Sequence, residues 1–273
     1  MIDQHASVAQ GAIIGKNVSI GAFSIIEQEV EIGDDTWIGS HVVIRNGTKI
    51  GSCNKIYQFS SIGEDPQFAA YKGEKTSLIV GNGNVIREYV TLNRGSPAGT
   101  GVTQIGDNNF LMAYVHIAHD SRLGDGITFA NGASLAGHVE IGDCAILGGF
   151  TLVHQFCRVG AHAITGIGTV CLKDTPPFLM VSGNPAKPYG INSKGLRRRG
   201  FGEDVVSAIK SGYRCLYRSN NDLQTAIEEL QSTRYNAKRS RTTCVIRHDF
   251  RSRYCSLEGT RGSGNNACRC GGG

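Results

Sequence analysis

The stretch Ile14-Gly15-Lys16-Asn17-Val18-Ser19-Ile20-Gly21 contains the pattern that decides the fold, because isoleucine followed by glycine returns after six residues. Apolar residues keep the same six-residue frame from Ile2 to Ile62. An amphipathic helix, with a period of 3.6, or an alternating strand, with a period of two, would not keep this spacing. Short repeats of this kind are typical of parallel β-helices.

The frame predicts how the coils stack. If three six-residue sides close one coil, residues 18 apart lie one above the other at the strand spacing of about 4.7–4.9 Å. We expect the glycines that follow the isoleucines to supply the permissive dihedrals that corners need. A second slot, four positions after each isoleucine, also holds residues that can face inward: Val18, Ser24, Val30, Thr36, Val42, Thr48 and Ser60.

Two interruptions and a change of period divide the chain. Residues 65–77 and 95–103 break the frame, and such loops on a rigid scaffold are candidate walls of a site. The repeat resumes, reaches about Cys171 and is expected to end at Pro176-Pro177, Pro185 and Pro188. We predict a β-helix over residues 1–190, a helical domain over 191–232 and an atypical, irregular tail over 233–273.

Apolar residues recur with helical spacing in residues 191–232. Val205, Ala208, Ile209, Leu216 and Tyr217 form one face of a helix predicted to start near Glu203, directly after the arginines at 197–199. A second helix is predicted from a capping-box start at Asn221 through Leu230.

The charge distribution gives no support for a nucleic-acid partner. Of the 28 Lys and Arg, nine lie from Thr233 onward, together with two of the 23 Asp and Glu, so residues 1–232 are close to neutral. Binding to nucleic acid would need a basic face on the body of the protein.

Cysteine usage and hydropathy predict a cytoplasmic protein. Cys53, Cys144, Cys157, Cys171 and Cys215 are scattered without a C-x-x-C spacing, which indicates reduced, small apolar residues. The N-terminus has no apolar signal region, and no stretch approaches the 18 apolar residues of a membrane span. We therefore expect no integral membrane segment.

The main functional signal is the block His116-Ile117-Ala118-His119-Asp120. Adding 18 to His119 gives Gly137, and adding 18 again gives Gln155, so one column is expected to hold a possible base, an approachable backbone N–H and an amide. His138 and His154 flank this column in the sequence. Four histidines should therefore gather near one corner of the coil.

Five blocks carry a resemblance to a known family: Ile56-Tyr57-Gln58-Phe59, His116-Ile117-Ala118-His119-Asp120, Leu135-Ala136-Gly137-His138, Val153-His154-Gln155-Phe156-Cys157 and Gly195-Leu196-Arg197-Arg198-Arg199-Gly200-Phe201. With the repeat, they resemble the left-handed β-helix acyltransferases, and most closely the UDP-N-acetylglucosamine acyltransferases of lipid A biosynthesis. The resemblance covers residues 1 to about 230. It implies a mostly β fold, a left-handed parallel β-helix of hexapeptide repeats followed by a small α-helical C-terminal domain.

The resemblance also implies a reaction. A 3-hydroxyacyl group on acyl carrier protein would be transferred to the 3-hydroxyl of a UDP-sugar by direct attack, without a cofactor or a metal. His119 matches the family's catalytic base, and histidine suits this work at neutral pH. Asp120 would fix its tautomer, and the Gly137 N–H would face the oxyanion.

The same matching implies binding roles and partners. His116 and His138 would line the sugar and thioester region, and His154 and Gln155 would hold nucleotide or pantetheine groups. Asn192, Arg198 and Arg199 would meet the uridine and diphosphate, since an arginine fork donates two parallel hydrogen bonds to phosphate. The family is homotrimeric, with sites between neighbouring subunits.

The sequence departs from the family at two places. Where relatives carry an aspartate and a lysine that contact the sugar, this loop reads Gln67-Phe68-Ala69-Ala70-Tyr71, so acceptor choice is open and a 3-amino sugar is a second candidate. Ile167 stands where some relatives have a glycine at the end of the acyl groove. We predict that it shortens the groove and favours about ten carbons over fourteen, each buried CH₂ being worth about 0.8 kcal/mol.

Three other functions are compatible with parts of the sequence. A zinc enzyme of the γ-carbonic anhydrase kind would use three histidines at subunit interfaces, but here the two histidines are followed by Asp120. A paralogue that binds acyl carrier protein without turnover would explain Phe68, Ala70 and the unusual tail. Related transferases that N-acylate a glucosamine nucleotide carry an additional N-terminal domain, whereas this sequence starts directly in the repeat.

Overall fold

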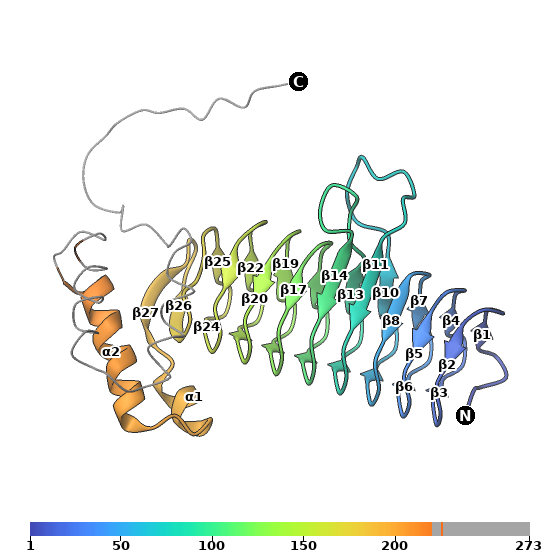
Figure 1. Ribbon diagram of the computed structural model, residues 1–273, viewed down its shortest axis with the longest axis horizontal. Helices are drawn as coiled ribbons and strands as arrows, with labels where there is room; N and C mark the ends of the chain where they lie inside the picture. Colours follow the sequence, from blue (N-terminus) through green and yellow to red (C-terminus); the bar gives the residue numbers. More distant parts are fainter. Residues whose placement is uncertain (220–224, 226–273) are drawn as a thin grey trace.

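The computed structural model describes residues 1–219 and residue 225. Its main body is a straight prism of stacked coils, with the helices at the end opposite the N-terminus (Figure 1). Within the described residues the strands form three sheets of nine, eight and ten strands, one on each side of the prism. The parallel β-helix predicted from the six-residue frame is confirmed.

The strands of the three sheets, each in its spatial order, have the following bounds. The first sheet contains β1 (Ser7–Val8), β4 (Ile25–Ile26), β7 (Val43–Ile44), β10 (Ser61–Glu64), β13 (Thr91–Asn93), β16 (His116–Ile117), β19 (Ser134–Leu135), β22 (Leu152–Val153) and β25 (Val170–Cys171). The second contains β2 (Ile13–Ile14), β5 (Glu31–Ile32), β8 (Thr48–Ile50), β11 (Ser77–Val80), β14 (Val102–Ile105), β17 (Arg122–Leu123), β20 (Glu140–Ile141) and β23 (Arg158–Val159). The third contains β3 (Ser19–Ile20), β6 (Trp37–Ile38), β9 (Lys55–Ile56), β12 (Val85–Ile86), β15 (Phe110–Leu111), β18 (Thr128–Phe129), β21 (Ile146–Leu147), β24 (Ile164–Thr165), β26 (Leu179–Ser182) and β27 (Lys187–Ile191).

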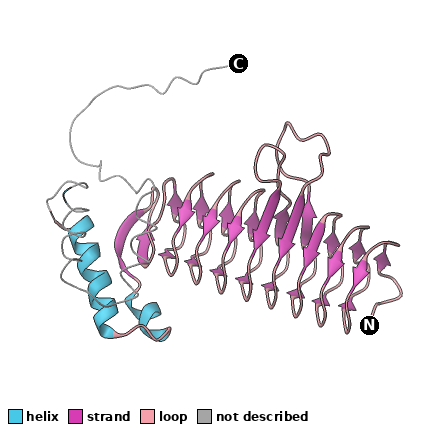
Figure 2. Ribbon diagram, in the orientation of Figure 1, coloured by secondary structure: helices cyan, strands magenta, loops and turns pink. Residues whose placement is uncertain are grey.

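Parallel pairing follows the predicted register of 18 residues, as in Ile26 opposite Ile44 and Ile117 opposite Leu135. The separation grows only where a loop is inserted, so Ile62 pairs with Leu92. Both predicted loops leave the prism next to each other, one between β10 and β11 and the other between β13 and β14 (Figures 1 and 2). They are the large projections from an otherwise even surface.

The interior consists of the apolar columns that the frame predicts. Isoleucines such as Ile38, Ile56 and Ile86 are fully buried, and burial of each such side chain contributes about 1.5–3 kcal/mol. Polar residues in the second slot are buried too, and Ser24, Thr36 and Ser60 donate their hydroxyls to carbonyls of the next coil, as Ser24 Oγ does to Gly39 at 2.7 Å. Each coil is therefore held to the next by backbone, apolar and side-chain contacts.

The predicted role of the repeat glycines is confirmed at Gly63, whose φ is 77°, but is wrong at the other glycines that follow the isoleucines between Ile14 and Ile50. Gly21 and Gly33 do not have a positive φ, whereas residues two positions further on, such as Phe23 and Asp35, do, at 60° and 56°. The glycines are required by close approach instead: a Cβ on Gly33 would lie 2.6 Å from the Gly51 carbonyl carbon and 2.7 Å from the Ser52 nitrogen.

The end of the repeat differs from the prediction. The prolines at 176 and 177 do not stop the sheet, because β26 follows them and pairs in parallel with β24. β27 then turns back to pair antiparallel with β26. The prolines precede the strand, where their missing N–H breaks no ladder.

Two helices follow, α1 (Ser193–Arg198) and α2 (Glu203–Tyr217). The predicted start of α2 is confirmed, but Val206 rather than Ala208 completes its buried face. Two of the three arginines lie inside α1, a helix that the sequence pattern did not predict. The predicted helix at 221–230 and the tail at 233–273 fall outside the described residues. Among the described residues, neither helix has the length and apolar character needed to cross a membrane.

The close packing of the repeat glycines against the backbone of the next coil can be tested by replacing one glycine with alanine, which adds a methyl group. Gly33→Ala should lower the free energy of unfolding by about 1–3 kcal/mol, because the Cβ would overlap backbone atoms that cannot move independently. Gly190→Ala is the matched control, since a Cβ there would meet nothing within 4 Å. Thermal unfolding of both variants measures the difference, and equal midpoints would contradict this account of the glycines.

Candidate active site

The site begins at the corner between β16 and β17, which carries His119 and Asp120. On β16 the side chain of Ile117 is buried in the core and that of His116 points outward. The corner that follows lies at the edge of the prism. Asp120 adopts a φ of 59°, a left-handed conformation that aspartate tolerates better than most residues. The Asp120 amide donates to Thr103 Oγ1 at 2.8 Å, which fixes the turn.

The Asp120 carboxylate is the most heavily hydrogen-bonded group of the site, and its side chain is completely shielded from solvent. The loop between β13 and β14 supplies four donors. Ser96 donates from its amide at 3.0 Å and from its hydroxyl at 2.6 Å to Oδ2. The Thr100 hydroxyl at 3.2 Å and the Gly101 amide at 3.0 Å lie against Oδ1.

Burial alone would raise the pKa of Asp120, but the hydrogen bonds from Ser96 and His119, aided by the nearby His138, outweigh it and lower the pKa below its ordinary value. The group is therefore an anion at neutral pH. An ionised carboxylate only accepts hydrogen bonds. Every polar neighbour must turn a donor toward it.

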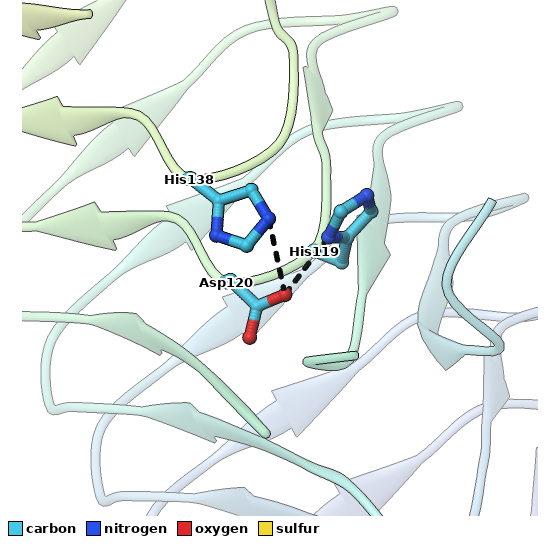
Figure 3. Close-up of side chains that lie close together, drawn as sticks. All are labelled: His119, Asp120 and His138. Carbon is cyan, nitrogen blue, oxygen red and sulfur yellow. Dashed lines mark hydrogen bonds and ion pairs between the residues drawn. The ribbon is translucent and has the colours of Figure 1, made fainter. Parts of the chain in front are cut away.

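His119 is oriented by this anion. Its Nδ1 lies 2.9 Å from Asp120 Oδ2 (Figure 3), and because the carboxylate only accepts, Nδ1 carries the proton. In the neutral imidazole Nε2 then has the free lone pair. The side chain is 14% exposed, so Nε2 can reach a substrate while the ring remains held.

Gly137 lies one coil further on, against the imidazole. A Cβ on this glycine would be 2.6 Å from His119 Cε1 and 2.8 Å from Nε2, so only glycine leaves the ring its place. No described residue accepts a hydrogen bond from the Gly137 N–H. The structure thus places His119 against Gly137, as the 18-residue column predicts, whereas Gln155, the third residue of that column, is exposed one coil further on.

Two further histidines surround the base. His138 meets His119 edge to face at 5.1 Å, stacks on Phe156 and directs Nε2 toward Asp120 Oδ2 at 3.9 Å (Figure 3). His116 Nδ1 lies 2.7 Å from Thr91 Oγ1. Burial, with a smaller contribution from His119, lowers the pKa of His116, so this ring is neutral at physiological pH.

The remaining predicted residues lie apart from this cluster. His154 and Gln155 are exposed at the next coil of the same corner, where the His154 ring contacts the Gln155 carbonyl at 3.1 Å. Arg198 and Arg199 are exposed at the end of α1. Ile167 is 82% exposed at the corner that follows β24.

Asn192 has a structural use that the sequence did not indicate. Its buried side chain caps α1 by accepting from the Gly195 amide at 3.0 Å, and it donates to the His162 carbonyl at 2.9 Å. Contact of Asn192 with a nucleotide therefore stays a prediction, as do the binding roles of the two arginines and of Ile167.

Sequence reasoning missed two residues of the site, Arg94 and Ser96. Phe68, which the sequence placed in the loop expected to contact the sugar, lies between β10 and β11 with its ring 6.1 Å from that of His119. Arg94 holds this loop through Asp65 and through the Tyr71 hydroxyl at 3.2 Å. Ser96, the donor to Asp120, lies 24 positions away in the sequence. Its position in the interrupting loop 95–103, a predicted wall of the site, was the one signal that indicated it.

A metal centre is a weaker interpretation of the same cluster. One ligand atom each from His119, Asp120 and His138 lies within 4.8 Å of the others. However, a cation there would compete with the N–H and O–H donors that already occupy both Asp120 oxygens. The donor set fits a hydrogen-bonded histidine-carboxylate pair.

A prism whose coils have three six-residue sides, with a histidine-carboxylate pair at one corner, matches the hexapeptide-repeat class of transferases. The family model described as bacterial transferase hexapeptide (six repeats) matches residues 103–137. The model described as UDP N-acetylglucosamine O-acyltransferase, domain 2, matches residues 174–251.

Comparison with individual proteins narrows the class. An acyl-[acyl-carrier-protein]--UDP-N-acetylglucosamine O-acyltransferase of Thiobacillus denitrificans is 61% identical over 225 residues, which cover 82% of this chain and 87% of the relative. One of Pseudomonas savastanoi is 53% identical and covers 84% and 89% of the two chains. The crystal structure of the Francisella novicida UDP-N-acetylglucosamine acyltransferase matches with a TM-score of 0.86 at 40% identity and covers 90% of this chain and 89% of that one.

The chain belongs to the UDP-N-acetylglucosamine O-acyltransferase family. The resemblance found in the sequence is therefore confirmed. So is the fold class, a left-handed parallel β-helix with a small helical C-terminal region.

The lowered pKa of Asp120 predicts a pH dependence of stability. A carboxyl whose folded pKa lies below its ordinary value of 3.8 stabilises the fold above that value, and this contribution is lost as pH falls through the folded pKa. Asp120→Asn should lower the free energy of unfolding by about 1–3 kcal/mol at pH 7. The difference from wild type should shrink below about pH 4, because only the wild-type side chain titrates. Denaturation curves between pH 7 and pH 3 measure this, and a constant difference would count against an ionised Asp120.

Proposed function

We propose that this chain transfers an acyl group from acyl carrier protein to UDP-N-acetylglucosamine, the first step of lipid A biosynthesis. Family membership supports the reaction class, since relatives up to 61% identical carry that enzyme's name. The observation that carries the chemistry is that the His119 ring, with Nδ1 held by Asp120, lies against Gly137, whose N–H has no acceptor among the described residues. The transferred group is a 3-hydroxyacyl chain and the acceptor atom is the 3-hydroxyl oxygen of the sugar.

The reaction proceeds by direct attack. His119 Nε2 takes the proton of the sugar hydroxyl while its oxygen forms a bond to the thioester carbonyl carbon. The Gly137 N–H donates to the carbonyl oxygen as it becomes negative, a contact of a kind worth about 2.7–4 kcal/mol in other enzymes. The carbon-sulfur bond then breaks, and the imidazolium returns its proton to the departing thiolate. The thioester already provides the activation, so no cofactor takes part.

Asp120 stabilises the imidazolium that forms during attack. It is a buried anion with its oxygens fixed by Ser96, Thr100 and Gly101, so it needs no rearrangement when His119 becomes charged. A preorganised charge of this kind acts more strongly than it would in water. His138, next to the same carboxylate, together with His116, lines the space for the sugar and the thioester.

Nucleotide binding is assigned to two places: the end of α1, and the coil that carries His154 and Gln155. The exposed Arg198 and Arg199 suit the diphosphate, whereas the third arginine, Arg197, is engaged by Glu203 at 2.9 Å. Asn192 is proposed to meet the uridine, and His154 with Gln155 the nucleotide or pantetheine groups.

We also propose a cytoplasmic homotrimer with sites between neighbouring subunits, which closes a three-fold ring. An exposed ladder of rings along one corner supports such contacts. His5, Phe23, His41, Phe59, Tyr89 and Tyr114 follow one another at centroid distances of 5.0–5.4 Å. Phe23, Phe59 and Tyr114 are 57%, 48% and 62% exposed in the single chain, a large apolar surface for a monomer.

Removing the base tests the mechanism. His119→Ala should lower kcat by about 10²–10⁴-fold with 3-hydroxyacyl carrier protein and UDP-N-acetylglucosamine, because the hydroxyl loses its proton acceptor. Lys49→Ala, which changes an exposed side chain of β8, should keep its turnover. Acyl transfer is measured by mass spectrometry of the acylated nucleotide. Turnover by His119→Ala at the wild-type rate would refute the role, and carrier binding without any wild-type turnover would indicate a non-catalytic paralogue.

A second acceptor remains a candidate because of Phe68. Its ring lies near His119 where a polar contact to the sugar was expected, so the loop offers an apolar wall there. The same assay with a 3-amino analogue of the UDP-sugar decides between the acceptors.

The acyl chain is proposed to run toward Ile167. The corners of His119 and Ile167 both border the sheet of β16, β19, β22 and β25, whose outward side chains include Leu152, 49% exposed. Wild type should prefer about ten carbons over fourteen, and Ile167→Gly should improve the longer donor at least about tenfold in relative kcat/KM, since several CH₂ groups at about 0.8 kcal/mol each gain room. Equal rates with both lengths in both proteins would refute this role of Ile167.

A further inference from the structure

The loop between β13 and β14 contacts the catalytic pair through one residue in particular. Ser96 is fully buried, although it belongs to a projecting loop. Both of its donors point at Asp120 Oδ2, the amide at 3.0 Å and the hydroxyl at 2.6 Å. The same oxygen holds His119 Nδ1 at 2.9 Å.

The two carboxylate oxygens have separate tasks. Oδ2 is shared by Ser96 and His119, whereas Oδ1 receives the Thr100 hydroxyl at 3.2 Å and the Gly101 amide at 3.0 Å. The Thr100 hydroxyl is also 2.9 Å from the Val102 carbonyl, so its single proton is divided between two acceptors. Ser96 therefore contacts the oxygen that controls the base, and Thr100 contacts the oxygen that does not.

We propose that Ser96 is a positioning residue: through Asp120 Oδ2 its hydroxyl sets the orientation and the basicity of His119. This inference rests on the proposed acyl transfer, in which His119 is the base.

The physical reason is competition for one oxygen. A short hydrogen bond to an ionised carboxylate is strong and draws electron density from its acceptor. With Ser96 Oγ in place, Oδ2 stabilises the imidazolium of His119 less than a free carboxylate oxygen would. Without the hydroxyl, Oδ2 keeps the Ser96 amide at 3.0 Å and the more distant His138 Nε2 at 3.9 Å but loses its shortest donor, so more of its charge acts on His119 and we expect the imidazole to stay protonated to a higher pH. The carboxylate also loses its shortest anchor and can rotate.

Other titratable groups face the pair and must be included in the interpretation. Among the described residues they are His116 on β16 and His138 at the corner after β19, while the loop between β10 and β11 contributes the apolar Phe68. Among the described residues neither histidine hydrogen-bonds to Ser96, so substitution of Ser96 affects them through Asp120 and His119.

The experiment compares the full-length wild type, Ser96→Ala, Ser96→Thr and Thr100→Val. In Ser96→Ala the acid limb of the kcat/KM profile should move upward by about half to one pH unit, and kcat should fall about three- to tenfold while KM changes little. Ser96→Thr keeps a hydroxyl and should restore the wild-type limb. Thr100→Val removes the loop's other hydroxyl contact with Asp120 and should leave the limb in place.

A second measurement does not depend on turnover. The pKa of the His119 imidazole is followed by NMR titration of its Cε1–Hε1 signal, assigned with His119→Ala, and should rise in Ser96→Ala only. If Ser96→Ala does not fold, Ser96→Cys, a weaker donor, should show an intermediate rise. An unchanged His119 titration in a folded Ser96 variant overturns the inference. Absence of wild-type transfer with the NMR shift present would instead refute the proposed reaction.

Discussion

The 18-residue register between coils is the constraint on which the rest of the molecule depends. It is set by fully buried columns such as Ile38 and Ile56 and by backbone pairing along all three sides. A slip by one residue would turn these side chains outward. The same register places His119 against Gly137, so the geometry of the site is a direct result of the packing of the core.

The site adds to this scaffold a buried anion. Asp120 is excluded from solvent, and a bare carboxylate in that position would be strongly unfavourable. Hydrogen bonds from Ser96, Thr100 and Gly101 stabilise the buried carboxylate. The same bonds hold the loop between β13 and β14 against the corner that carries His119. The position of the loop between β13 and β14 and the basicity of His119 are thus coupled through Asp120.

The sequence was most informative where structure repeats. The frame predicted the coils, the column of His119 and Gly137 and the position of both loops, because each follows from a period of six. The function of the repeat glycines was predicted correctly at Gly63 but wrongly at others such as Gly33, since a sequence does not show whether a glycine is needed for a positive φ or for close approach. Ser96, Phe68 and the cap formed by Asn192 depend on contacts across irregular segments, for which no period exists.

In the proposed reaction the sugar hydroxyl lies between His119 Nε2 and the Gly137 N–H. A crystal structure of the enzyme with its acylated UDP-sugar product would show this arrangement. We expect the ester carbonyl oxygen within about 2.7–3.1 Å of the Gly137 nitrogen, and the ester oxygen of the sugar within hydrogen-bond distance of His119 Nε2. A product bound with its ester away from both groups, at another corner of the prism, would rule out His119 and Gly137 as the reacting pair.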